Sequence, residues 1–183
     1  AFTPMREPIR QRAEQFKKLL TETQPAHLDA VLKFAELAYR RPLTSGESAE
    51  LRQLYDKLRR EELPHDQAVR LTLARVLVSP AFLYRAEQPA PGNKPAPVND
   101  WELATRLSYF LWSSAPDAEL RSVAAHGELH QPDVLVQQAR RMLRDPRVRR
   151  LATEFACVWL HIHAFDELNE KSERHFPNFI ELR

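Results

Sequence analysis

The sequence predicts an all-α protein made of two small helical domains, arranged as helical hairpins or an orthogonal bundle and joined by a proline-rich linker. Apolar residues recur at spacings of three and four through most of the 183 residues, as on the buried face of a helix. Only 3 glycines are present, and neither an alternating strand pattern nor a two-residue hairpin turn occurs. We predict domains at 1–88 and 99–183, packed against one another, with a linker at 89–98.

In the first domain, the pattern predicts helices over 5–21 and 27–39, and Pro25 either ends the first or begins the second. Arg41 and Pro42 stop the second helix, because proline disfavours the helical conformation of the residue before it. Thr44 and Glu47 have the spacing of a capping box, which opens a third helix ending near Leu63. The remaining helices follow Pro64 and Pro80.

In the second domain, Asn99 and Glu102 form another capping-box pattern, which opens a helix through Leu111. A short helix capped from Ser114 and Asp117 follows, and Gly127 ends it as a left-handed residue. Further helices are expected over 132–143 and from the Asp145–Pro146 cap to about Ile162.

Composition excludes several classes of protein. The 27 Lys and Arg against 25 Asp and Glu give a net charge of +2, too small to favour a nucleic-acid binder. Cys157 is the single cysteine, so the chain holds no intrachain disulfide and no CxxCH motif for covalent haem; we expect no cofactor and a buried, inert thiol. No apolar run is long enough to span a membrane. Because residue 1 is Ala, we expect a processed form or a piece of a longer chain.

The strongest local charge feature is a cluster of six arginines, which we call the arginine cluster. Clustered guanidinium groups suit phosphate, acidic polymers or an acidic partner surface, because they attract and hydrogen-bond anions together. The alternative is a solvated helix face paired with carboxylates from elsewhere. The cluster consists of Arg140, Arg141, Arg144, Arg147, Arg149 and Arg150.

A second group, weaker as a site, combines histidines with a carboxylate near the end of the last predicted helix: His161, His163, Asp166 and His175. These types can bind a divalent metal, but the spacing matches no known ligand pattern, and positions i and i+2 of a helix point apart. We therefore interpret them as surface or capping residues and predict no metal. His126 and His130 straddle Gly127 and are interpreted in the same way. No catalytic motif is present, so no catalytic residue is assigned.

Several segments of the sequence resemble a pair of adjoining planctomycete-type domains of unknown function. They are FAELAYRRPLT from Phe34, LVSPAFLYRAE from Leu77, WELATRLSYFLWSSAPDAEL from Trp101, and the later ARRMLRDPRVRRL, FACVWL, FDEL and HFPNF. The family occurs in large exported bacterial proteins that often carry a c-type cytochrome module. The resemblance implies an extracytoplasmic location, partner proteins or further domains, and a second domain that continues into more helices than this chain holds.

We therefore expect a non-catalytic structural or protein-interaction module of an exported bacterial assembly, which docks with a cytochrome or another redox partner. Two alternatives stay open. The chain could be part of an oxidoreductase or hydrolase whose active site other domains complete, with Arg106 or His161 in the pocket. It could also bind an anion or acidic polymer through the arginine cluster.

Overall fold

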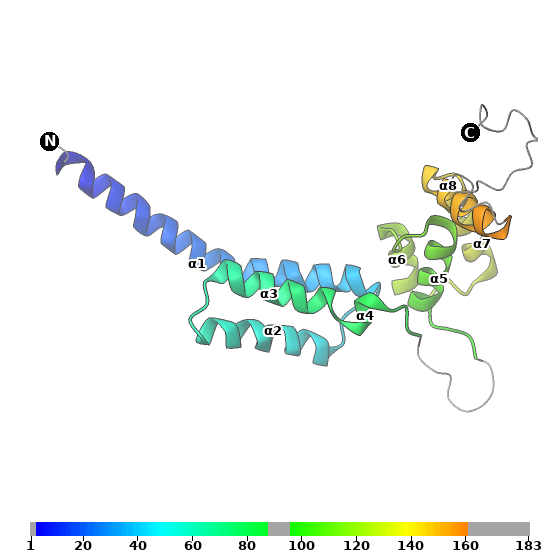
Figure 1. The fold of residues 1–183 in the computed structure, drawn as a ribbon, viewed down its shortest axis with the longest axis horizontal. Coiled ribbons are helices and arrows are strands. Elements are labelled where there is room, and N and C mark those ends of the chain that lie inside the picture. Colours follow the sequence, from blue (N-terminus) through cyan, green and yellow to red (C-terminus); the bar gives the residue numbers. More distant parts are fainter. Residues whose placement is uncertain (1–2, 88–95, 161–183) are drawn as a thin grey trace, which may run out of the picture. The chain divides into compact units, whose positions relative to one another are not determined.

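The computed structural model describes residues 3–87 and 96–160, with side chains from residue 7 onward. Helices and turns make up these ranges, and no strand occurs within them, which confirms the all-α prediction (Figure 1). The chain divides into two compact units, 1–101 and 102–183. The predicted domain limits and the linker at 89–98 stay a prediction, because most of that linker lies outside the described residues. None of the described helices is long and apolar enough to cross a membrane.

Unit 1 is built on three helices that pack side by side and a short fourth. Helix α3 contacts both α1 and α2, and its buried Ala68, Thr72 and Val76 face them. The core also contains Leu28, Val31, Leu32, Ala35, Tyr39, Leu51 and Tyr55 from α1 and α2. The helices are α1 (Thr3–Tyr39), α2 (Ser45–Arg60), α3 (His65–Leu77) and α4 (Pro80–Leu83).

Helix α1 differs from the prediction, because it runs for 37 residues through Pro25 without a break. Proline lacks one backbone N–H, and this loss alone does not end a helix whose following turns are packed. Beyond Pro25, the residues from Leu28 onward are held by the core of unit 1. Before it, α1 extends past the ends of α2 and α3 (Figure 1).

A predicted capping box and an ion pair define the turn from α1 to α2. Thr44 accepts a hydrogen bond from the Glu47 N–H, and the Glu47 carboxylate accepts one from the Thr44 N–H, so the capping box is confirmed. The same carboxylate pairs with both terminal nitrogens of Arg41 at 2.8 Å. The hydrogen bonds from Arg41 outweigh burial and lower the pKa of Glu47 to about 2.

Arg40 joins the end of α1 to α4. Its backbone is left-handed, with φ of 62°, and its side chain is buried. The guanidinium donates to four carbonyl oxygens, those of Ala38, Ala81, Phe82 and Tyr84. Three of these acceptors lie at the end of α4, where backbone carbonyls have no helical partner. Arg40 therefore holds the end of α1 against the end of α4, and we call this set of hydrogen bonds the Arg40 clasp.

Unit 2 folds around Trp112, whose indole is fully buried at the end of α5. Its Nε1–H donates to the Met142 carbonyl oxygen at 3.0 Å, and Leu120, Leu129 and Met142 are equally buried. Gly127 has a φ of 70°, as expected for the residue that ends α6. The helices are α5 (Asp100–Trp112), α6 (Ala118–Ala125), α7 (Pro132–Leu143), η1 (Pro146–Val148), α8 (Arg149–Leu151), η2 (Ala152–Ala156) and α9 (Cys157–Trp159).

The last predicted helix is irregular in the part that the structure describes, residues 146–160. Asp145 caps it as expected, by accepting from the Arg147 N–H at 2.8 Å. The chain then passes through a 3-10 turn and a π-helical segment before Trp159. Cys157 in this segment is half-buried, which is more exposed than the sequence suggested.

Candidate functional site

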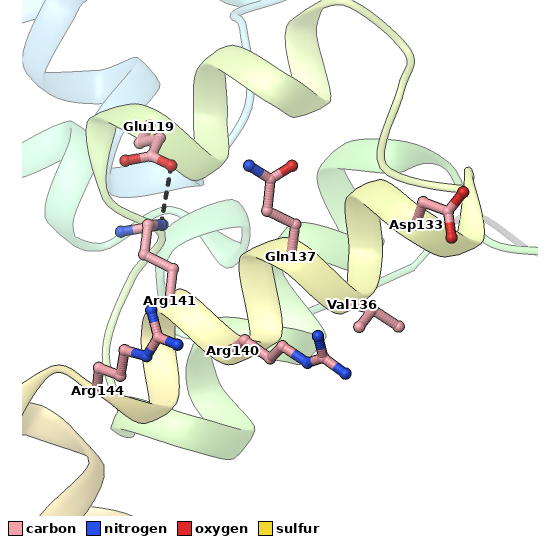
Figure 2. A pocket seen from close by; sticks show the side chains of 7 residues that line it. All are labelled: Glu119, Asp133, Val136, Gln137, Arg140, Arg141 and Arg144. Carbon is pink, nitrogen blue, oxygen red and sulfur yellow. Dashed lines mark ion pairs between the residues drawn. The ribbon is translucent and has the colours of Figure 1, made fainter.

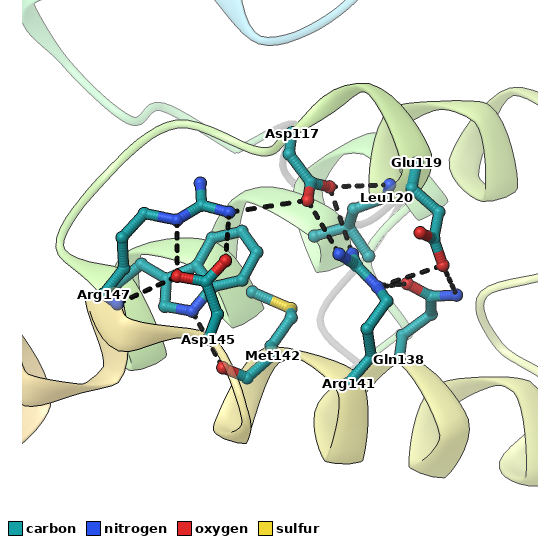
Figure 3. Close-up of polar contacts among 9 residues, drawn as sticks. Asp117, Glu119, Leu120, Gln138, Arg141, Met142, Asp145 and Arg147 are labelled. Atoms are coloured by element: carbon teal, nitrogen blue, oxygen red, sulfur yellow. Dashed lines mark hydrogen bonds and ion pairs between the residues drawn. The ribbon is translucent and has the colours of Figure 1, made fainter.

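The arginine cluster divides into paired and unpaired members. Arg141 donates two hydrogen bonds to the Asp117 carboxylate, at 2.8 and 3.1 Å, and pairs with Glu119 at 3.0 Å (Figure 3). Asp117 also caps α6 through the Leu120 N–H. Burial raises the pKa of Asp117, but the bonds from Arg141 and Leu120 outweigh it, and the pKa is lowered. Arg141 thus ties α7 to the start of α6.

Arg147 is held in the same network. Its guanidinium pairs with Asp145 at 2.7 Å and lies 3.7 Å from Asp117 (Figure 3). The guanidinium carbon is 3.5 Å from the centre of the Trp112 ring, a cation–π stack. The hydrogen bonds from Arg147 lower the pKa of Asp145 to about 2. Arg150 donates to the Trp112 carbonyl oxygen at 3.3 Å, so it too faces this core.

The other three cluster members, Arg140, Arg144 and Arg149, are exposed and make no side-chain hydrogen bond or ion pair with another described residue. Arg140 and Arg144 line a pocket of about 520 Å³ along α7 (Figure 2). The other lining residues are Glu119, Asp133, Val136, Gln137 and Arg141. Two carboxylates therefore share the pocket with three guanidinium groups, one of which is already paired. The six arginines, which look equivalent in the sequence, therefore differ in the structure. Arg140 and Arg144 have no side-chain partner among the described residues and lie beside the network of Arg141 and Arg147.

His161, His163, Asp166 and His175, the residues considered above as metal ligands and interpreted as surface or capping residues, lie outside the described residues. Within residues 3–87 and 96–160, no group of three or more His, Cys, Asp or Glu side chains is placed to hold a metal ion. His126 Nδ1 donates a hydrogen bond to the Ser122 carbonyl oxygen at 2.7 Å.

The structure brings together a histidine pair that the sequence did not suggest. His27 Nδ1 lies 2.9 Å from His65 Nε2, and the other ring nitrogen of His65 lies 2.8 Å from the hydroxyl of Tyr55. Burial and the neighbouring His27 and Arg59 lower the pKa of His65, against the opposing effect of Asp66. These residues come from all three long helices of unit 1, so only the tertiary fold reveals them. Two imidazoles and a phenol make a hydrogen-bonded chain, and no other His, Cys, Asp or Glu among the described residues is placed to complete a metal site with the two histidines.

A surface that the sequence also did not single out is the exposed apolar side of α1, which we call the α1 face. Ile9 and Phe16 are 61% and 60% exposed, and Leu20 and Leu37 are both 45% exposed. Phe34 on the same side is 39% exposed. The spacing of apolar residues in the sequence predicted a helix here. It did not show which of these apolar side chains would stay outside the core of unit 1.

The two units correspond to two family matches. Residues 28–87 match the family described as PSD5, protein of unknown function (DUF1595), and residues 98–183 match PSD4, protein of unknown function (DUF1592). These matches support the planctomycete-type family. Searches of curated proteins and of solved structures found no match.

Within the PSD5 match, two of the sequence segments that carry the resemblance contact one another through Arg40. FAELAYRRPLT contains Arg40, and LVSPAFLYRAE contains three of the carbonyl oxygens that accept its hydrogen bonds. Within the PSD4 match, RLSYFLWSS and ARRMLRDPRVRRL meet at Trp112, which contacts Met142 and Arg147. Ser108 from the first phrase is fully buried and donates to the Thr105 carbonyl oxygen. At these positions, the sequence segments that carry the resemblance form structural contacts within each unit.

Proposed function

We propose that the chain is a protein-interaction module without reaction chemistry of its own. The observation that supports it is the α1 face, a row of large apolar side chains left uncovered by unit 1. Exposed apolar side chains that gather on one helix side mark interaction surfaces, whereas scattered ones do not. The contrast with the arginine cluster strengthens the proposal, because Arg141 and Arg147 form hydrogen bonds and ion pairs that stabilise unit 2.

The proposal is tested with a photo-crosslinking amino acid placed at single positions of α1 in the producing cells. Incorporation at Phe16 should give one adduct of constant mass, because a partner covers that side. Incorporation at Gln11, exposed on another side of the same helix, is the matched control and should give none. Equal labelling at both positions, or none at either, would contradict an interaction surface here.

We also propose that the assembly is extracytoplasmic and includes a c-type cytochrome or another redox partner. The support is the family resemblance, which implies exported proteins that often carry a c-type cytochrome module; the two matches concern the family alone. Native mass spectrometry of the protein isolated from its source should find a stable complex with a haem-bearing subunit. A lone chain in the cytoplasmic fraction would remove this part of the proposal and leave the interaction surface to be explained separately.

A second candidate function is anion binding through Arg140 and Arg144. The pocket of about 520 Å³ between these side chains favours it. Binding of a sulfated polysaccharide such as heparin should weaken steeply with added salt and fall at least tenfold in Arg144→Glu. Arg52→Glu, an exposed arginine of unit 1, is the control and should bind nearly as the unchanged protein does. Binding that is insensitive to both salt and Arg144→Glu would remove this candidate.

A further inference from the structure

The α1 face has the spacing of a coiled-coil seam. Its apolar residues are Ile9, Ala13, Phe16 and Leu20, then Ala30, Phe34 and Leu37, all on one heptad pattern with alternating steps of three and four. Thr23 and His27 fill the two seam positions between these groups. A period of 3.5 residues sustained over four heptads is typical of a helix that packs along another helix. Polar residues at single seam positions set the register of such pairs.

The seam is distinct from the side of α1 that builds the core of unit 1. At about 100° per residue, the buried residues Leu28, Val31 and Ala35 lie roughly 90° around the helix from Phe16 and Phe34. The hydrogen-bonded contact of His27 with His65 places α3 next to the seam without covering it, since Phe34 and Leu37 remain exposed. The same helix therefore packs inward along one side and offers a second apolar side.

Charge is arranged around the seam in a way that indicates its partner. Arg10, Arg12, Lys17 and Lys33 occupy four of the eight positions that flank the seam between residues 9 and 37, two on each side. The other four hold Leu19, Gln24, Ala26 and Val31, and Val31 belongs to the core of unit 1. All acidic residues of the described part of α1 lie on the opposite side of the helix: Glu7, Glu14, Glu22, Asp29 and Glu36. Of the flanking cations, only Arg10 has an ion pair with another described residue, Glu14. The seam is thus bordered by positive charge and by no carboxylate.

This arrangement disfavours a second copy of the chain as the partner. In a parallel pair, Arg12 of one helix would face Lys17 of the other. In an antiparallel pair, flanking cations of one helix would face flanking cations of the other. Like charges at these positions select against self-pairing. A helix with carboxylates at its flanking positions would instead form salt bridges on both borders of the seam.

We propose that the α1 face binds an amphipathic helix of a partner protein, with apolar residues at the seam and Glu or Asp at the flanking positions. This inference rests on the proposed interaction function and names the chemistry of the partner. The apolar seam supplies the area buried on binding, and the flanking cations select the acidic helix and its register.

The test uses the full chain and two designed four-heptad peptides, both with Leu at the seam positions. One peptide carries Glu at the flanking positions and the other carries Lys. Isothermal titration at low salt should give at least tenfold tighter binding of the Glu peptide, and added salt should reduce the preference. Equal affinities, no binding of either, or a preference for the Lys peptide would overturn the proposal.

Variants locate the binding. Leu20→Asp should weaken the binding of the Glu peptide at least tenfold. Gln11→Asp changes an exposed residue away from the seam and should leave the affinity for this peptide nearly unchanged. The double variant Arg12→Glu with Lys17→Glu should reverse the preference toward the Lys peptide. These side chains are exposed in the chain by itself, so circular dichroism should show unchanged helix content in all three variants.

Two further measurements distinguish a partner helix from other binding partners of the α1 face. Co-sedimentation with phosphatidylglycerol vesicles that is lost in Leu20→Asp, without peptide binding, would overturn the partner helix in favour of an anionic membrane surface. A concentration-dependent dimer in analytical ultracentrifugation, dissociated by Leu20→Asp, would overturn it in favour of self-association. Crosslinks at Phe16 without Glu-peptide binding would reject this inference while leaving the proposed function standing.

Discussion

At the scale of single residues, Asp117 is the point where the polar network of unit 2 converges. It caps α6, accepts two hydrogen bonds from Arg141 and lies within 4 Å of Arg147. The Asp117–Arg141 pair is mostly shielded, with 23% and 28% of the side chains exposed. Such pairs contribute more to stability than fully exposed ones, because water screens them less.

Asp117→Asn should isolate the charged contribution. Asparagine caps a helix about as well as aspartate, so the loss comes from the weakened bonds to Arg141 and Arg147. We expect unfolding free energy to fall by about 1–3 kcal/mol, measured by urea denaturation with tryptophan fluorescence. Asp133→Asn, an exposed carboxylate on α7, is the control and should change it by less than about 0.5 kcal/mol. Equal effects would show that the network does not stabilise unit 2.

His65 gives unit 1 a pH dependence of defined direction. Its pKa is lowered in the folded state, so the unfolded chain binds the proton more readily. Stability should therefore decrease as the pH falls from about 7 through 6.5 toward the folded-state pKa, and stay reduced below it. The groups that face this imidazole are His27 from α1, Tyr55 and Arg59 from α2, and Asp66 beside it on α3.

The check is a urea titration at pH 7.5 and pH 5 of the protein and of His65→Gln. The urea midpoint of the unchanged protein should fall between the two pH values by more than that of His65→Gln, which has no proton to bind there. His126→Gln in unit 2 should keep the full dependence. A pH effect of equal size in His65→Gln would assign the effect to other groups.

At the scale of elements, the end of α1 depends on one side chain. Arg40 satisfies four carbonyl oxygens from a buried position, and three of them end α4. Arg40→Met keeps the aliphatic stem and leaves these acceptors without a donor, so we expect a loss of about 2–4 kcal/mol in unfolding free energy. Arg52→Met removes an exposed pair with Asp29 and should cost below about 1 kcal/mol. Similar losses in both variants would mean that Arg40 is not a clasp.

Elements with local signals were predictable from the sequence. The Thr44–Glu47 box, the Asp117 and Asp145 caps and Gly127 all act within four residues of the helix end they define. Pro25 misled the prediction, because whether a proline ends a helix depends on the packing of the turns around it. Local rules therefore identified the starts of helices better than the continuity of α1.

Site features depended on contacts that sequence spacing does not contain. Arg141 and Arg144 look alike in the sequence, yet only Arg141 faces Asp117, which is 24 residues away. His27 and His65 are 38 positions apart and meet because α1 and α3 run side by side. The α1 face required knowledge of which side of the helix the core uses. Pairing partners and exposed sides are tertiary properties. The sequence therefore showed the arginine cluster without the roles of its members, and it did not indicate the histidine pair or the α1 face.

At the scale of the whole molecule, the two units each have a core of their own. The core of unit 1 is formed by α1, α2 and α3, and that of unit 2 surrounds Trp112. The family matches follow the same division, with 28–87 and 98–183 matched separately. A unit with its own core can keep its fold when the chain between the two is cut.

Limited proteolysis tests this independence. The sequence from 88 to 99 contains four prolines, one glycine and Lys94, and no large side chain beyond Gln88, Lys94 and two asparagines. We expect endoproteinase Lys-C to cut first after Lys94 and to release two fragments that each keep helical circular dichroism and cooperative melting. Lys57, within the bundle helix α2, is the internal control and should be cut much later. Protection of Lys94 for as long as Lys57 would instead mean that the two units and the chain between them unfold together, and single-unit stabilities would then have no separate meaning.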